Sequence, residues 1–288
     1  MRQRFTGFVR QFDRQIAGGG SDVSGFVDAR VGYDSNINTA TELNAIVIPL
    51  FSFLGPGQLG GAAVAQSDEF CDITAGSSGV TAIGRQDRLF ASVLGNWRDD
   101  FDTSTFDQAA LTGTASYAHS FANDDVISLS GQVQQFWLDD AGLRTSYGVT
   151  TQYTKPLAGG KALTVSGQWD GLDFNGDPLR DADRFSVGTG FVGKLFAANL
   201  TAGTEETRRQ AGDHLSFGFV GANLGAELPL ARRLVVVGGI GFDLRRHDAP
   251  DPLFLVKRAD KRLDLSAGLK VAITDRLFFQ STATYSGN

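Results

Sequence analysis

The stretch Leu143-Arg-Thr-Ser-Tyr-Gly-Val-Thr-Thr-Gln-Tyr-Thr154 decides the fold of this chain. Its odd-numbered positions read Leu, Thr, Tyr, Val, Thr and Tyr, whereas its even-numbered positions read Arg, Ser, Gly, Thr, Gln and Thr. Side chains point to alternate faces along a strand, so the stretch predicts a β-strand with one apolar and one polar face.

The same alternation recurs along most of the chain. It predicts thirteen strands, centred near residues 25–34, 68–79, 88–98, 107–119, 126–138, 143–154, 162–170, 184–195, 198–206, 214–227, 234–245, 258–271 and 277–286. Most span about ten residues, whereas soluble strands average about 5–6 and a tilted membrane-spanning strand needs about 9–11. In 214–227 the residues Phe217, Phe219, Val220 and Leu224 do not share one parity, which predicts a bulge.

Charge is segregated between the two faces of these strands. The apolar faces carry almost none over their middle stretches, as expected where a lipid-facing charge costs about 2–4 kcal/mol. We therefore predict an antiparallel transmembrane β-barrel in the outer membrane of a Gram-negative bacterium. The residues predicted to face its lumen are Asp28, Arg30, Arg144, Gln152, Gln168, Asp170, Arg184, Lys194, Asp243, Arg245, Arg262, Asp264 and Lys270.

The connections between these strands alternate in length. Short ones lie at 121–125, 155–160, 196–197, 229–233 and 274–276, and longer ones at 35–66, 170–183, 207–213 and 246–257. Short periplasmic turns and long outer loops give this pattern. Thirteen strands would leave Asn288 at the outer surface. Because bacterial single-chain barrels close with an even number, we expect a fourteenth strand to follow.

Aromatic residues cluster at the predicted strand ends. We predict two girdles at the membrane boundaries, formed by Tyr33, Trp97, Trp137, Trp169 and Tyr285 at the outer ends and by Tyr117 and Tyr153 at the opposite ends. The alternative is the aromatic core of a soluble sandwich, which would scatter such residues along the strands.

Residues 1–20 form a separate region. Phe5, Val9, Phe12 and Ile16 recur every three or four residues, which predicts a short amphipathic helix before a glycine-rich linker. The barrel then occupies 21–288. No signal peptide is visible, so we expect an export signal further upstream in the natural protein. The sequence contains no apolar run of about 20 residues, which a helical membrane protein would need.

Composition argues against several other functions. The net charge is −6, which gives no basic footprint for nucleic acid. The single Cys71 fits an apolar filler better than a reactive thiol. His119, His214 and His247 are scattered, and none is paired by spacing with a nucleophile. We therefore expect neither an enzyme nor a cofactor.

Three further segments each allow two interpretations. The five aspartates within 170–183 resemble oxygen ligands for calcium, but a solvated outer loop fits better because Arg180 dilutes the charge. The apolar connection at 44–55 predicts either a partial plug of the lumen or a hairpin packed on the rim. The lumen-facing charges either pair with one another, which we favour, or form a transverse field that orients cargo.

The first strand ends in Val31-Gly-Tyr-Asp-Ser-Asn-Ile-Asn38. This motif, with Gly32, Tyr33, Asp34, Ser35, Asn36 and Asn38, resembles the signature that opens the C-terminal barrel of the surface lipoprotein assembly modifier family. The segment Gln66-Ser-Asp-Glu-Phe70 and the closing Tyr285-Ser-Gly-Asn288 are also similar, and the resemblance spans about residues 22–288.

That resemblance implies a 14-stranded barrel behind a periplasmic tetratricopeptide-repeat domain, and a role in moving lipoproteins to the cell surface. Helical repeats are absent from this sequence. Asp, Ser and Asn bond their own backbone, so the motif is more simply a loop-initiating turn at the outer rim than a gating or cargo contact.

We accordingly expect translocation or surface display of proteins such as lipoproteins. The alternatives are a passive pore for small solutes or secreted polymer, and a structural or adhesive barrel. The expected partners are outer-membrane lipid and lipopolysaccharide, protein cargo, and a periplasmic helical-repeat domain outside this chain, with no nucleic acid.

Overall fold

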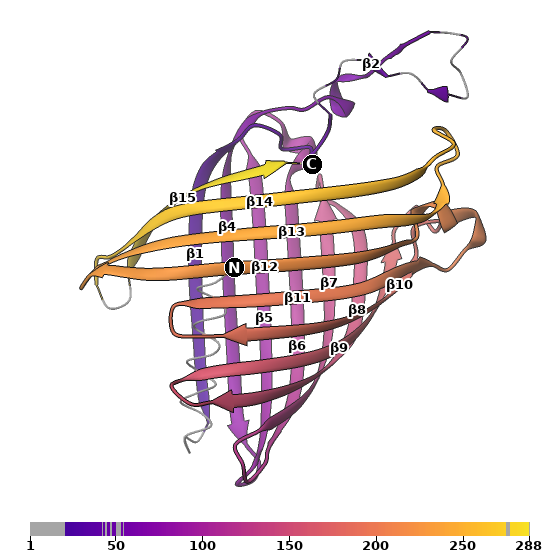
Figure 1. Cartoon of the computed structure of the whole chain (residues 1–288). Helices are drawn as coiled ribbons and strands as arrows, with labels where there is room; N and C mark the ends of the chain where they lie inside the picture. The colour runs from indigo at the N-terminus through magenta and orange to yellow at the C-terminus, as the bar shows by residue number, and fades with distance from the viewer. Residues whose placement is uncertain are drawn as a thin grey trace. The chain divides into compact units, whose positions relative to one another are not determined.

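The computed structural model describes residues 21–41, 43, 45–46, 48–49, 53, 55–274 and 277–287 (Figure 1). The predicted helix and linker at 1–20 lie outside the described residues. In the part of the chain that is described, no helix has the length and apolarity needed to cross a membrane.

Thirteen long strands form one sheet. In chain order they are β1 (Asp22–Asp34), β4 (Asp68–Ala82), β5 (Asp87–Asp100), β6 (Gln108–Ser120), β7 (Val126–Leu138), β8 (Ala141–Leu157), β9 (Lys161–Phe174), β10 (Ala182–Val192), β11 (Phe196–Thr207), β12 (Phe217–Ala231), β13 (Leu234–Pro250), β14 (Lys257–Ala272) and β15 (Phe278–Gly287). Their order in the sheet is their order in the chain. The all-β fold class and all thirteen predicted strands are confirmed, and each strand overlaps its predicted range. Closure by a fourteenth strand stays a prediction.

The short elements lie in the connections. They are β2 (Ala45–Ile46) and β3 (Gly57–Gln58), which pair in a small sheet of their own, and the 3-10 helices η2 (Gly61–Ala63), η3 (Ser104–Phe106) and η4 (Gln210–Leu215). Within the connection from β1 to β4, Thr41 also forms a bridge with Val64.

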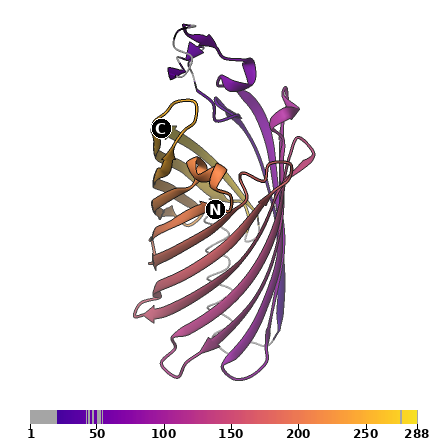
Figure 2. The same cartoon turned by 90° about the vertical axis from the view of Figure 1, so that its right-hand side faces the viewer.

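The chain divides into two compact units. Unit 1 comprises 1–149 and 170–181, and unit 2 comprises 150–169 and 182–288. Unit 1 thus holds β1 and β4 to β7, and unit 2 holds β10 to β15; Figures 1 and 2 show these two runs of strands in indigo to magenta and in orange to yellow. Strands β8 and β9 contribute to both units. The registers described within each unit are antiparallel.

Each strand has an apolar face that no other residue in the described part of the chain covers. Val93 of β5 is 54% exposed, Val133 of β7 is 57% exposed and Val187 of β10 is 65% exposed. The buried hydrophobic residues among those described number only six, and they are Ile37, Val80, Val126, Leu172, Ala182 and Phe217. A soluble sandwich would bury its apolar faces between two sheets. An exposed apolar face on every strand instead requires a lipid environment.

Connection lengths follow the predicted alternation with one exception. Short turns occupy 83–86, 121–125, 158–160, 193–195 and 232–233, and the opposite connections at 35–67, 101–107, 175–181, 208–216 and 251–256 are longer. The exception is the turn between β7 and β8, which consists of Asp139 and Asp140 alone. Both have positive φ angles, of 50° and 58°, as a two-residue hairpin turn requires.

Four predicted boundaries are corrected. Lys194 lies in the turn after β10 instead of on a lumen-facing strand, because β10 ends at Val192. The connection predicted at 196–197 is the turn 193–195, where Gly193 donates its N–H to the carbonyl of Phe196 at 2.8 Å. The outer ends of β9 and β13 also run further than predicted, to Phe174 and Pro250.

The predicted bulge at 217–224 is wrong. Strand β12 pairs with β11 and β13 in continuous register from Phe217 to Leu224, and its irregularity falls later, between Pro229 and Ala231. The parity changes because Phe217 and Phe219 belong to the polar face, opposite His247 and Arg245, respectively. Both phenylalanines pack beside arginines: Arg245 lies 5.4 Å from the Phe217 ring centre, and Arg184 lies 5.9 Å from that of Phe219.

Candidate functional site at the outer rim and polar faces

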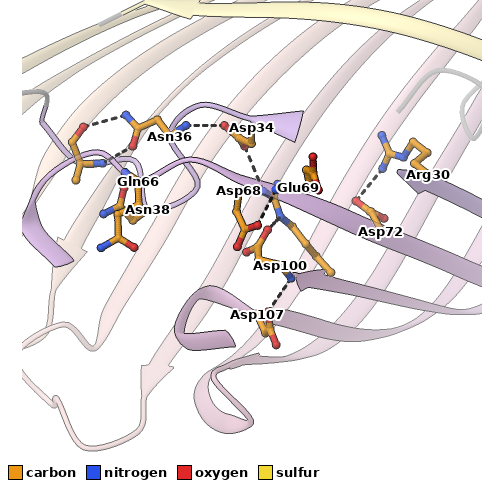
Figure 3. A network of polar contacts seen from close by, with 12 residues as sticks. Arg30, Asp34, Asn36, Asn38, Gln66, Asp68, Glu69, Asp72, Asp100 and Asp107 are labelled. Atoms are coloured by element: carbon orange, nitrogen blue, oxygen red, sulfur yellow. Dashed lines mark hydrogen bonds and ion pairs between the residues drawn. The ribbon is translucent and has the colours of Figure 1, made fainter. Parts of the chain in front are cut away.

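The motif residues that follow β1 build the start of the long connection (Figure 3). Asp34 accepts a hydrogen bond from the backbone N–H of Asn36 at 3.0 Å. The Asn36 side chain then bonds both backbone groups of Ala40, accepting from its N–H at 3.0 Å and donating to its carbonyl at 2.9 Å. These are the local side-chain bonds by which Asp and Asn form turns.

Asn38 joins the two ends of this connection. Its amide donates to the Val64 carbonyl at 2.7 Å, and its side-chain oxygen accepts from the backbone N–H of Gln66 at 3.1 Å. Ile37 donates its backbone N–H to the Gln66 carbonyl at 2.8 Å and is itself buried. The motif therefore clasps residues that are almost thirty positions apart.

The remaining motif positions have steric or boundary roles. A Cβ atom at Gly32 would lie 2.7 Å from the Phe70 ring, so that ring requires a glycine opposite it. Tyr33 lies on the apolar face near the end of β1 and is exposed. Ser35 directly follows β1 and opens the connection.

An acidic cluster lies beside the motif, and we call Asp34, Asp68, Arg98, Asp100 and Asp107 the rim cluster. Arg98 donates to Asp34 at 3.2 Å and to Asp100 at 3.0 Å, and its guanidinium lies 4.2 Å from the Phe70 ring centre. Asp34 and Asp68 are directly opposite each other across β1 and β4. Like charges in that position repel each other.

The other two carboxylates of the rim cluster bond backbone groups. Asp68 accepts from the N–H groups of Glu69, Asp102 and Thr103 at 2.7, 2.9 and 3.0 Å. Asp107 accepts from the backbone N–H of Asp100 at 2.9 Å. Sequence reasoning missed Asp68, Arg98, Asp100 and Asp107. The shared parity of Arg98 and Asp100 at the end of one strand was the available signal.

One step further along the same strands, Arg30 lies between two carboxylates. It donates to Asp72 at 3.0 Å and lies 3.6 Å from Asp28. Asp72 also accepts from Asn96 at 2.9 Å. Apart from Arg88 at the opposite end of β5, the rest of the polar face of β4 to β7 is uncharged. Its hydrogen bonds include Ser116 to Ser130 and Gln134 to Thr112, at 2.8 and 2.9 Å.

Arg144 and Asp170 lie on the polar faces of β8 and β9, within unit 1. Arg144 lies 5.9 Å from the ring centre of Phe136 and 5.7 Å from that of Phe174. Asp170 is buried and accepts from Gln132 at 3.0 Å. These side chains pack against their neighbours and support the end of β9.

Unit 2 carries paired charges on its polar face. Arg184 pairs with Glu205 directly opposite it on β11. Asp243 and Arg262 are directly opposite each other, as are Arg245 and Asp260. Arg245 and Arg262 each also bond an aspartate two residues away on their own strand, Asp243 at 2.8 Å and Asp264 at 2.9 Å, respectively. We call these charged residues of β10, β11, β13 and β14 the ion-pair ladder; they are Arg184, Glu205, Asp243, Arg245, Asp260, Arg262 and Asp264.

The other predicted lumen positions also lie on strands. Lys270 lies 4.7 Å from the Phe278 ring centre. Gln152 donates to Thr154 on the same strand at 3.0 Å. Gln168 lies on β9 with the parity of Asp170.

The girdle aromatics fall at matching heights within unit 1. Trp97 pairs with Ala109, which pairs in turn with Trp137, so the two indoles flank one alanine at the outer end of the sheet. Tyr117 lies at the opposite strand ends and donates to Asp87 at 2.6 Å. His119 bonds the same carboxylate at 2.8 Å, a contact that its sequence spacing did not reveal.

The girdle aromatics of unit 2 also occupy strands. Trp169 lies on β9, and Tyr153 on β8 and Tyr285 on β15 are exposed.

The aspartates at 170–183, for which calcium binding was the alternative to a solvated outer loop, do not come together as a metal group. Asp170 bonds Gln132, whereas Asp181 accepts from the backbone N–H of Phe174 at 2.8 Å. Within the described ranges no three acidic, His or Cys side chains form a ready-made metal group. The apolar connection at 44–55 lies largely outside the described residues. Phe53, which is described, is 79% exposed.

Long antiparallel strands, each with an exposed apolar face and a polar face, define this chain as a transmembrane β-barrel protein of the bacterial outer membrane. Strands cross a membrane only in this class, because every backbone group must find a partner strand.

Comparison with known proteins gives distant structural likenesses. No family model matches the chain, and no curated protein matches it. The ferric preacinetobactin receptor BauA from Acinetobacter baumannii is similar over 93% of this chain, with 12% identity and a TM-score of 0.40; this chain spans about half (52%) of that receptor. The translocator domain of the autotransporter NalP from Neisseria meningitidis is similar over 99% of this chain and 92% of its own, with 11% identity and a TM-score of 0.31.

Proposed function

We propose that this barrel translocates or displays proteins, such as lipoproteins, at the cell surface. The observation that carries the proposal is the connection between β1 and β4. It comprises the 33 residues between Asp34 and Asp68 and is far longer than any other connection. It contains its own small sheet, and its sequence between 44 and 55 is strongly apolar. Leu43 and Phe53, which are described, are 61% and 79% exposed. Exposed apolar side chains in a connection are typical of a surface that contacts other proteins.

A second apolar surface supports the same proposal. The connection between β13 and β14 exposes Leu253, Phe254, Leu255 and Val256 at its tip. Its turn is ordered by Asp251, which accepts from the N–H groups of Leu253 and Phe254 at 2.8 and 3.0 Å. A passive pore for small solutes has no need of four consecutive apolar side chains outside the membrane. The likeness of the motif to the lipoprotein assembly family agrees with protein cargo.

The test replaces residues 43–63 with a short Gly-Ser linker and keeps the clasp of Asn38 with Val64 and Gln66. Surface display of a lipoprotein encoded by a neighbouring gene should be lost, while the amount of folded barrel stays unchanged. A matched control replaces 176–179, in a polar outer connection of the same unit, and should leave display intact. Normal display by the 43–63 variant would refute the proposal.

The alternative is a passive pore, which the uncharged hydroxyl and amide groups on the polar face of β4 to β7 would suit. The purified protein in planar bilayers should then show steady conductance. If the 43–63 replacement changed conductance but not display, the pore would be the better description.

A further inference from the structure

The hairpin of β13 and β14 carries basic residues on its lipid-facing side. Phe242 of β13 is directly opposite Leu263 of β14, and both side chains are exposed on the apolar face. Lys261 is the next residue of β14 on that face, and Arg246 is the second after Phe242 on β13. Arg246 and Lys261 therefore lie just beyond the apolar stretch, at the outer end of the hairpin that Figure 1 draws in shades of orange.

Small neighbours leave room around Arg246. It is directly opposite Gly218 on β12 and Ala259 on β14. A Cβ atom at Gly218 would meet one backbone oxygen, at 3.9 Å, so the space beside the guanidinium is open. Lys261 is two residues from Ala259 and thus a diagonal neighbour of Arg246; such neighbours lie about 7–8 Å apart, within reach of long side chains. Both side chains are exposed, so a single anionic group can contact both.

These cations have no counter-ion in the described part of the chain. Among the described residues, the side chains of Arg246, Lys261 and Lys257, which shares the parity of Lys261, take part in no ion pair or hydrogen bond. Asp248 shares the parity of Arg246 and is exposed, yet no ion pair joins the two. By contrast Arg245, which precedes Arg246 on the polar face, bonds a carboxylate at 2.8 Å. A group of unpaired cations favours an anionic ligand.

The height of these cations on the strands corresponds to the lipid headgroups of the outer leaflet. Tyr285, which we predict for the outer aromatic girdle, is directly opposite Leu265 of β14. Lys261 lies four residues further out, which is about 13 Å along the strand at about 3.3 Å per residue. Aromatic girdles mark the boundary of the hydrocarbon region. Arg246 and Lys261 therefore lie at the level of the headgroups, above the apolar residues that contact acyl chains.

We propose that Arg246 and Lys261, with Lys257 beside them, bind the phosphate groups of lipopolysaccharide in the outer leaflet. A phosphate monoester carries about −1.5 to −2 charges at neutral pH. An arginine can donate two parallel hydrogen bonds to it, and a lysine adds a point charge on a flexible stem. The apolar face below, with Phe242 and Leu263, contacts the acyl chains of the same lipid. This site is separate from the connection after β1, on which the proposed display function rests.

The test measures binding of lipid A, the phosphorylated anchor of lipopolysaccharide, to the purified full chain in detergent by native mass spectrometry. The wild-type protein should retain lipid A. The double variant Arg246→Gln with Lys261→Gln should bind it about thirtyfold more weakly, because each basic residue near a charged lipid surface contributes about fivefold. Unchanged affinity in this variant would overturn the proposal.

The matched control removes the same charge from the opposite face. Arg245 and Arg262 are the direct chain neighbours of Arg246 and Lys261, and they point to the polar face. The double variant Arg245→Gln with Arg262→Gln should bind lipid A as the wild-type protein does. An equal loss in both double variants would mean that binding follows net charge alone, and the site would be refuted.

Changing the ligand tests the site even where a variant does not fold. Lipid A from which both phosphates have been removed should bind the wild-type protein far more weakly, and equal binding of the two lipids would contradict the proposal. Inorganic phosphate should not displace lipid A, because it makes no contact with the apolar face. Displacement would assign the site to a soluble anion instead of a lipid. Binding is measured on the purified protein, so its failure is distinguishable from failure of surface display in cells.

Discussion

The polar faces of the two units share one alternation but use different chemistry. In unit 1 the face of β4 to β7 is joined by hydroxyl and amide contacts such as Ser116 to Ser130, and its charges other than Arg88 gather at the outer end. In unit 2 the ion-pair ladder uses opposite charges instead, as where Arg184 of β10 faces Glu205 of β11 and Asp243 of β13 faces Arg262 of β14. Alternation thus specifies which face is polar and leaves open how that face is satisfied.

The apolar faces should behave alike in both units, and this is the largest effect we predict. Val133→Arg on β7 and Val187→Arg on β10 should each destabilise the folded protein by about 2–4 kcal/mol, because each places a charge in lipid. Urea unfolding in lipid vesicles measures the loss. Gln132→Arg, on the polar face beside Val133, is the control and should cost far less. Equal costs at 132 and 133 would mean that the two faces are not distinct.

The hydrogen bonds of Asn38 should stabilise the long connection after β1, which belongs to unit 1. Asn38→Ala removes two hydrogen bonds that span the connection after β1, and each bond contributes about 0.5–1.5 kcal/mol. We expect stability to fall by about 1–2 kcal/mol and proteases to cleave faster between 55 and 65. Ser35→Ala, in the same motif, should leave both measurements unchanged. Slow cleavage in Asn38→Ala would show that the clasp is dispensable.

Salt should weaken the coupling between charged residues of unit 2 but not the coupling between hydroxyl groups of unit 1. A double-mutant cycle of Asp243→Ala and Arg262→Ala should give a coupling of about 0.2–1 kcal/mol that declines from 0.05 M to about 1 M salt. The matching cycle of Ser116→Ala and Ser130→Ala should give a coupling that salt leaves unchanged. If the coupling energy between Asp243 and Arg262 did not depend on salt, the two polar faces would not differ in their electrostatics.

The smallest effect concerns the turn at Asp251. Backbone N–H groups of Phe254 and Leu253 lower the pKa of its carboxyl, so these bonds are intact at neutral pH and weaken as the pH falls through that lowered pKa. Asp251→Ala should leave global stability unchanged but speed chymotrypsin cleavage at 253–255, as mass spectrometry would show. Asp248→Ala is the control. Unchanged cleavage would mean that the bonds do not order the turn.

The strands were predictable because their signal is local. Each two-residue alternation, as in 143–154, reports both that a strand exists and which face is apolar. The outer end of β13 was underestimated because alternation fades where a strand leaves the membrane and residues such as Arg246 are exposed. The outer end of β9 was underestimated for another reason, since Asp170 and Leu172 are both buried there and apolar and polar positions no longer differ in exposure. Phe217 and Phe219 led to the wrong prediction of a bulge because we expected both rings on the apolar face. Both lie on the polar face instead, where each ring packs beside an arginine.

The rim cluster could not be predicted because it depends on register. Asp34 meets Asp68 only because β1 pairs with β4 at that offset, and 33 intervening residues carry no information about it. Arg98 reaches Asp34 across the strand between them. By contrast, the turn-forming role of Asp34 and Asn36 follows from residue type alone, since Asp and Asn bond nearby backbone wherever they stand.

The two-residue turn at Asp139 and Asp140 has a consequence for the order of assembly. A chain that reverses within two residues loses little entropy when β7 meets β8, whereas joining β1 to β4 must close 33 residues and costs about 2 kcal/mol more by length scaling alone. We therefore expect hairpins with two-residue turns, β7–β8 and β12–β13, to form early and the pairing of β1 with β4 to form last. The first strand of the sequence would then be among the latest to settle.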